Sequence, residues 1–201
     1  MMTEVLANQD HHEHHDDSGS RVVFGFWIYL MSDLILFATL FAAYAVLRNN
    51  TYGGVGIAQI TDLPRVLTET LVLLISNLTI GFAFLSQQRA SKQGVILWLL
   101  VTFLIGLAFV GIEYQGFSQL VAVGNDWQRS AFLSAFFTLL GVHWFHVIAG
   151  LLWTIILIIQ FASQGTSSKM ATRLTCLGLF WHFVNIIWIF IFTIVYLMGV
   201  I

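Results

Sequence analysis

Two histidines stand three residues apart inside an apolar stretch of the chain, the segment GVHWFHVIAG. If this stretch is a helix, His143 and His146 share one face of it. A pair of this kind suits four different roles: ligation of a haem, half of a metal site, relay of a proton, or packing between helices. The pair alone leaves these alternatives open, so we turn to the other polar residues in apolar surroundings.

Further polar residues lie within apolar segments, where an ionisable side chain is costly and therefore suggests a function. They are Asp33, Glu69, Asn77, Glu113, His182 and Asn185. Asp33 is either a proton-exchanging carboxylate or a hydrogen-bonded residue that fixes a helix contact. Glu69 lies near the start of its apolar run and is expected to reach interfacial water, whereas Asn77 lies deeper and is expected to bridge helices. His182 and Asn185 share a helical face.

A metal or haem site would have to be assembled from these same residues. A haem within a helix bundle needs histidines on facing helices, and His143 or His146 opposite His182 would supply them. A non-haem metal needs more ligands, and only Glu113 is a plausible addition. Hydrogen bonds between side chains of neighbouring helices satisfy the same groups without a metal. We therefore expect a structural or proton-linked polar network, with no catalytic, metal-binding or cofactor-binding residue in this chain.

The elements that must position these residues follow from composition. The chain has 201 residues, of which 58% are hydrophobic and 9% charged, against roughly 45–50% and 25% in soluble domains. Crossing a bilayer takes about 20 consecutive apolar residues. Five such runs occur, at 22–47, 66–86, 95–114, 131–162 and 174–201. The predicted fold is therefore an all-α integral membrane protein, a bundle of five transmembrane helices at 22–201.

Charge predicts the orientation of the bundle. Lysine and arginine favour cytoplasmic loops. The side of the amino terminus carries Arg21, Arg89, Lys92, Lys169 and Arg173, and the opposite side carries Arg48, Arg65 and Arg129. This bias predicts a cytoplasmic N-terminus and a periplasmic C-terminus. Residues 1–21 are polar, acidic and rich in histidine, and we expect them to form a disordered tail. The net charge of −2 argues against a nucleic-acid partner.

Small residues within the predicted helices are expected to let the helices approach closely. They are Gly25, Gly106, Gly111, Gly141, Gly150 and Gly178. A bulky charge at Gly141 or Gly150 is predicted to block assembly by wedging helices apart.

Three segments in order resemble subunit III of the haem–copper respiratory oxidases. The segments are FGFWIYLMSDLILFATLFAAYAVL, RSAFLSAFFTLLGVHWFHVIAGLLW and LFWHFVNIIWIFIFTIVYLMG. Together they extend the resemblance from about residue 21 to residue 201. The branch of the family that the chain resembles most is the five-helix form found in bacterial bo-type ubiquinol oxidases.

The resemblance implies an accessory subunit of a proton-pumping terminal oxidase that passes electrons from ubiquinol to O₂. In this family the haems and copper belong to subunit I. Subunit III contacts subunit I directly, shares the complex with subunits II and IV, holds phospholipid and supports proton uptake. The implied location is the bacterial inner membrane, and the chain itself is expected to hold no cofactor.

The resemblance also bears on single residues. Asp33 stands where the family has an intramembrane carboxylate, although many relatives have Glu there. Asn185 stands where many relatives have Asp, and an amide cannot exchange a proton. Glu113, His143, His146 and His182 match polar positions of the family, which assigns them no metal. Two other classes remain as alternatives, a haem-b membrane anchor and a small proton-coupled transporter.

Overall fold

The protein is a bundle of long helices in the computed structural model, which describes the backbone of residues 2–200 and the side chains of residues 19–199. The long helices are α1 (Met2–Leu47), α3 (Leu63–Gln88), α4 (Lys92–Ala122), α5 (Ala131–Gln164) and α6 (Ser168–Ile191). A single turn, α2 (Ile57–Ile60), interrupts the first loop, and the last helix continues through η1 (Phe192–Leu197) and α7 (Met198–Val200). Five helices are long and apolar enough to cross a membrane, which confirms the predicted all-helical fold with five spans.

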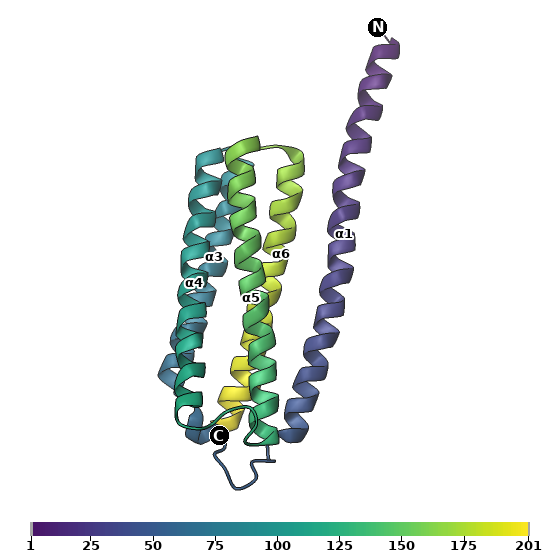
Figure 1. Cartoon of the computed structure of the whole chain (residues 1–201). Helices are drawn as coiled ribbons and strands as arrows, with labels where there is room; N and C mark the ends of the chain where they lie inside the picture. Colours follow the sequence, from purple (N-terminus) through teal and green to yellow (C-terminus); the bar gives the residue numbers. More distant parts are fainter. Residues whose placement is uncertain (1, 201) are drawn as a thin grey trace.

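The two chain ends lie at opposite ends of the bundle, as five crossings require (Figure 1). The first residue of the predicted tail at 1–21, Met1, lies outside the described residues. The backbone of the tail continues α1 from Met2 onward, and the side chains before Gly19 lie outside the described ones. The disorder of this tail therefore stays a prediction.

Serine side chains define the start of three helices. Ser91, Ser130 and Ser167 each accept a hydrogen bond from the backbone N–H three residues later, and so satisfy a donor that the helix leaves unpaired. Capping by Ser167 starts α6 six residues before the apolar run at Leu174. The only proline of the chain, Pro64, lies in the first turn of α3, where its missing N–H costs no helical hydrogen bond.

Helix α4 also extends past its predicted apolar run, from Tyr114 to Ala122. Polar residues such as Gln115 and Ser118 interrupt the run without interrupting the helix, because the Ser118 hydroxyl bonds to the carbonyl of Gln115 within it. The helix ends before Gly124, whose φ of +80° suits glycine.

Helix α6 is the central element of the bundle. Its spanning segment is 56% buried, whereas that of α1 is 22% buried. It contacts α1, α3 and α5, and in Figure 1 it lies behind α5, with α3 and α4 to one side and α1 to the other. The buried face of α6 carries Trp181 and Trp188, which are both 1% exposed.

Two glycines make room for the Trp181 indole. A Cβ atom at Gly106 of α4 would lie 3.1 Å from this ring, and one at Gly150 of α5 would lie 2.9 Å from it. The glycines therefore let α4 and α5 approach α6 more closely than any larger residue would permit. Gly141 differs, because a Cβ atom there would meet no atom within 4 Å. Close helix packing within this chain is thus found at Gly150 but not at Gly141, which lines an open groove. The prediction that a bulky charge at either position blocks assembly stays a prediction.

Replacing Gly150 by leucine is expected to destabilise the bundle, while the same change at Gly141 is expected to be tolerated. Leucine at position 150 must displace Trp181 and Phe180, and overpacking of this kind costs roughly 1–3 kcal/mol. Thermal unfolding of the two purified variants in detergent measures the difference. Equal loss of stability in both would contradict the assignment of Gly150 to a packed contact.

Candidate functional site

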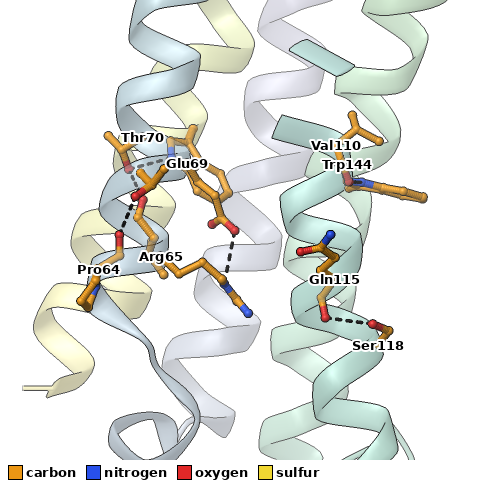
Figure 2. A network of polar contacts seen from close by, with 11 residues as sticks. Pro64, Arg65, Glu69, Thr70, Val110, Gln115, Ser118 and Trp144 are labelled. Atoms are coloured by element: carbon orange, nitrogen blue, oxygen red, sulfur yellow. Dashed lines mark hydrogen bonds and ion pairs between the residues drawn. The ribbon is translucent and has the colours of Figure 1, made fainter. Parts of the chain in front are cut away.

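Two buried carboxyl groups and one guanidinium meet where α3 and α4 pack together. Glu69 and Glu113 are 0% and 2% exposed, and the two carboxyl groups are close enough to interact directly. Arg65 lies one turn before Glu69 on α3, with its Nε atom 3.4 Å from Oε1 of Glu69 (Figure 2). Gly116 of α4 leaves the space for the guanidinium, since a Cβ there would lie 2.5 Å from its Nη atoms. We call these four residues the carboxyl cluster.

The carboxyl cluster is short of hydrogen bonds. Among the described residues, no hydrogen bond is made by Nε of Arg65, by either carboxyl oxygen of Glu69 or by Oε2 of Glu113. A buried charge is costly unless an opposite charge balances it. Two carboxyl groups beside one guanidinium are balanced when the carboxyl pair carries one proton. The cluster is therefore a charge centre with two buried carboxyl groups and a guanidinium that is 24% exposed. The expectation that Glu69 reaches interfacial water was wrong, because its side chain is fully buried.

Asp33 and His146 form a second polar pair, between α1 and α5. Oδ2 of Asp33 lies 3.7 Å from Nε2 of His146. Nδ1 of the same imidazole is 2.7 Å from the carbonyl of Val142, and because a carbonyl only accepts, this nitrogen carries the hydrogen. In neutral imidazole Nε2 would then present a lone pair to the carboxyl group. A favourable contact needs a proton between them, on the imidazole or on the carboxyl group.

The Asp33–His146 pair lies beside an open groove between α1 and α5. The groove has a volume of about 380 Å³ and is lined by aromatic rings together with His146. Its lining residues include Phe26, Tyr29, Trp153 and Phe180. Asp33 itself is 9% exposed. This pair therefore borders the outside of the chain, whereas both carboxyl groups of the carboxyl cluster are buried.

The two histidines of GVHWFHVIAG face different helices. His143 is 1% exposed, and its Nε2 lies 3.2 Å from the carbonyl of Val184 on α6. His146 faces α1 instead. The ring of Phe37 on α1 packs against both imidazoles. Among the described residues, neither histidine makes a hydrogen bond or ion pair with Glu113, which belongs to the carboxyl cluster.

His182 of α6 is paired with Asn77 of α3. Nδ1 of His182 lies 2.5 Å from Oδ1 of Asn77, which gives Asn77 the bridging position predicted for it. Asn185 is buried and donates to the carbonyl of Trp181 within its own helix. His182 therefore contacts α3, whereas Asn185 bonds within α6, although the two residues were expected to share a helical face.

The polar residues lie at different contacts between helices. This distribution can be compared with the haem or metal site that the sequence left open. Among residues 19–199, no three His, Cys, Asp or Glu side chains lie close enough together to hold a metal ion. His143 and His182 are each engaged by another helix, His143 with a backbone carbonyl and His182 with an amide. The geometry favours pairwise helix contacts and protonatable pairs over a ligand set.

Several residues that make these contacts are not among the polar residues that the sequence analysis predicted to be functional. Arg65 contributed only to the predicted orientation of the bundle, although its spacing of four residues from Glu69 is that of an ion pair on a helix. Hydroxyl groups were overlooked as well: Ser76 and Thr70 of α3 accept hydrogen bonds from the indoles of Trp181 and Trp188. Thr79 and Thr102 join α3 to α4 at 2.8 Å. The sequence pattern that could have predicted these contacts is a set of hydroxyl residues at helical spacing on one apolar segment together with tryptophans at helical spacing on another.

Comparison with known proteins shows the family of the chain. Residues 2–200 match the family model described as cytochrome c oxidase subunit III. The chain is 53% identical to the cytochrome bo(3) ubiquinol oxidase subunit 3 of Pseudomonas aeruginosa over 188 residues, 94% of this chain and 90% of that protein. It is 41% identical to the quinol oxidase subunit 3 of Bacillus subtilis over 187 residues, 93% and 92% of the two chains. It is 39% identical to the cytochrome c oxidase subunit 3 of Bacillus sp. strain PS3, over 91% and 88%.

Replacing Arg65 by leucine is expected to destabilise the carboxyl cluster, because it removes the only cation from two buried carboxyl groups. Loss of one partner from a buried pair costs up to about 3 kcal/mol. The double variant Arg65→Leu, Glu69→Gln removes one charge of each sign and is expected to recover most of this loss. Chemical unfolding of the three proteins in detergent measures the effect. Additive losses in the double variant would show that the two residues do not interact.

Proposed function

The chain belongs to the cytochrome c oxidase subunit III family, and we propose that it is subunit III of a proton-pumping terminal oxidase that transfers electrons from ubiquinol to O₂. The observation that carries this proposal is the 53% identity to a bo(3) ubiquinol oxidase subunit 3 across 94% of the chain. The proposed partners are subunit I, in direct contact, and subunits II and IV of the same complex. As an accessory subunit, the chain stabilises subunit I in the membrane.

We also propose that this chain carries no catalytic centre. Haems and copper, which supply the chemistry of O₂ reduction, are assigned to subunit I. Support comes from the side chains here: the imidazoles of His143, His146 and His182 are each committed to a hydrogen bond within the bundle. The residues of this chain therefore hold helices together and hold protons, and the electron transfer belongs to its partner.

The proposed location is the bacterial inner membrane, with the N-terminus in the cytoplasm and the C-terminus in the periplasm. The charge bias supports this orientation. Two basic residues at the proposed cytoplasmic end also cap the bundle there, since Lys92 donates to the carbonyl of Ala162 at 2.7 Å and Arg173 donates to Gln160 at 2.7 Å.

Bound phospholipid is part of the proposal. A groove of about 450 Å³ lies between the start of α1's spanning segment and the start of α6. Gly19, Ser20, Ser168 and Thr172 line one part of it and Trp27 another. Small polar groups beside an aromatic ring suit the boundary between headgroups and acyl chains.

Proton uptake is assigned to the Asp33–His146 pair. The pair needs a shared proton and borders an open groove. The carboxyl cluster also needs a proton for charge balance, but both of its carboxyl groups are buried. We therefore propose that Asp33 and His146, rather than Glu69 and Glu113, support exchange of protons during turnover.

The proposal is tested by purifying the intact complex through an affinity tag on this chain. Mass spectrometry under native conditions is expected to show a larger haem-containing chain, further subunits and phospholipid together with it. The separated chain is expected to have no Soret absorption. A Soret band that remains with the separated chain would favour a haem-b anchor instead.

Asp33→Asn is expected to leave the haem content of the complex unchanged while lowering sustained O₂ consumption. Asparagine keeps the size of the side chain but cannot hold the shared proton. Haem per complex and the rate over repeated turnovers provide the two measurements, and Ser32→Ala, next to it on the exposed side of α1, is the matched control. Loss of haem in Asp33→Asn would count against a role separate from the cofactors, and an unchanged rate would argue against proton exchange at this pair.

A further inference from the structure

His182 lies at the centre of a membrane span, on the exposed side of its helix. The span that contains it runs from Ser168 to Leu197, which places His182 fourteen residues from one end and fifteen from the other. The exposed side of α6 is a stripe at helical spacing, in which Ile186 and Ile189 are 50% and 45% exposed. His182 is partly exposed within this stripe. An imidazole at mid-depth thus faces the outside of the chain.

The hydrogen bond to Asn77 satisfies only one nitrogen of this imidazole. Nδ1 faces the amide oxygen of Asn77, which only accepts, so Nδ1 carries the hydrogen. In neutral imidazole Nε2 is then an acceptor, and among the described residues no donor reaches it. Hydrocarbon offers no donor either, and an unsatisfied polar group costs free energy there.

Other exposed polar groups at membrane depth do not have this problem. The hydroxyls of Ser32 and Thr39 on α1 donate to carbonyls of their own helix, so these positions can face lipid. His182 differs, because its Nδ1 hydrogen is already given to Asn77 and a carbonyl of its own helix has no hydrogen to offer to Nε2. His182 therefore marks a place where lipid is a poor neighbour.

The surface around His182 suits another helix. On α3, Leu78 is 60% exposed, and a Cβ atom at Gly81 would meet no atom within 4 Å. Gly81 lies one turn after Asn77, so the surface is shallow next to the polar pair. Small residues beside an interhelical hydrogen bond are the features that let membrane helices associate. We call this surface the α3–α6 face, formed by Asn77, Leu78, Gly81, His182, Ile186 and Ile189.

We propose that the α3–α6 face docks a transmembrane helix of another oxidase subunit, and that this helix donates a hydrogen bond to Nε2 of His182. The donor is a hydroxyl, amide or indole group at mid-membrane depth. The inference rests on the proposed function, because it takes the partner from the oxidase complex. It goes beyond that function by naming the surface through which another subunit holds this chain in the complex.

The face is tested by photocrosslinking in the intact, purified complex. Ile186 is replaced by p-benzoylphenylalanine, and Leu104 of α4, whose exposed fraction of 55% is close to the 50% of Ile186, is the matched control. Irradiation of the Ile186 variant is expected to give an adduct with the mass of this chain plus another subunit. The Leu104 variant is expected to give mainly lipid adducts.

Each other outcome is decisive. Lipid adducts alone from Ile186, in a complex that still contains the other subunits, overturn the docking surface but leave the proposed function intact. An adduct between two copies of this chain replaces the oxidase subunit with a homodimer and also overturns the inference. Failure of the chain to co-purify with any haem-containing partner, seen before irradiation, contradicts the proposed function instead.

A second pair of variants tests the hydrogen bond itself. His182→Phe keeps a ring in the face but removes the acceptor, whereas Ile189→Phe changes the size of a neighbouring side chain and keeps the acceptor. Detergent washing is expected to strip the His182→Phe subunit from the complex faster than the Ile189→Phe subunit. Equal retention, with both proteins folded by circular dichroism, would show that Nε2 of His182 binds no partner.

Discussion

The bundle depends on two indole hydrogen bonds that fix α6 against α3. Nε1 of Trp181 donates to the hydroxyl of Ser76, and Nε1 of Trp188 donates to Thr70, each at 3.0 Å. Both rings are buried at membrane depth, where water is absent and an unpaired N–H is costly. The two acceptors, six residues apart on α3, therefore set both the rotation and the axial position of α6. Gly106 and Gly150 then bring α4 and α5 onto the first of these rings.

The same constraint distributes the ionisable groups. Polar side chains at membrane depth gain from partners within the bundle, and three pairs form: Asp33 with His146 between α1 and α5, Asn77 with His182 between α3 and α6, and Glu69 with Arg65 within α3. These three pairs lie at separate places in the bundle. An accessory role in an oxidase is compatible with this arrangement, since it requires stable helix packing and places for protons but no redox centre.

The number of helices could be predicted from the sequence because a membrane span depends only on the length and apolarity of one segment. Contacts between helices could not, because they depend on how each helix is rotated. Gly141 and Gly150 look alike in sequence, yet only Gly150 faces a packed ring. Glu69 looked interfacial from its place near a helix start, but rotation of α3 turns it toward Glu113. The polar end of α4 was missed because Gln115 and Ser118 lower hydropathy without breaking the helix.

Helix α1 gives the Asp33–His146 pair a different character from the carboxyl cluster. With its spanning segment only 22% buried, α1 is the most loosely packed of the five spans. Its main anchor is Phe37, which is 1% exposed and packs against His143 and His146. The Asp33–His146 pair thus lies beside the Phe37 ring that holds α1 to α5, next to an open groove. A change in charge at this pair acts on α1, the span with the smallest buried share, whereas a change at Glu69 and Glu113 is confined between two helices that pack along much of their length. The pair thus lies on the span with the smallest buried share and next to an open groove. These two features are the physical reason for proposing proton exchange at Asp33 and His146.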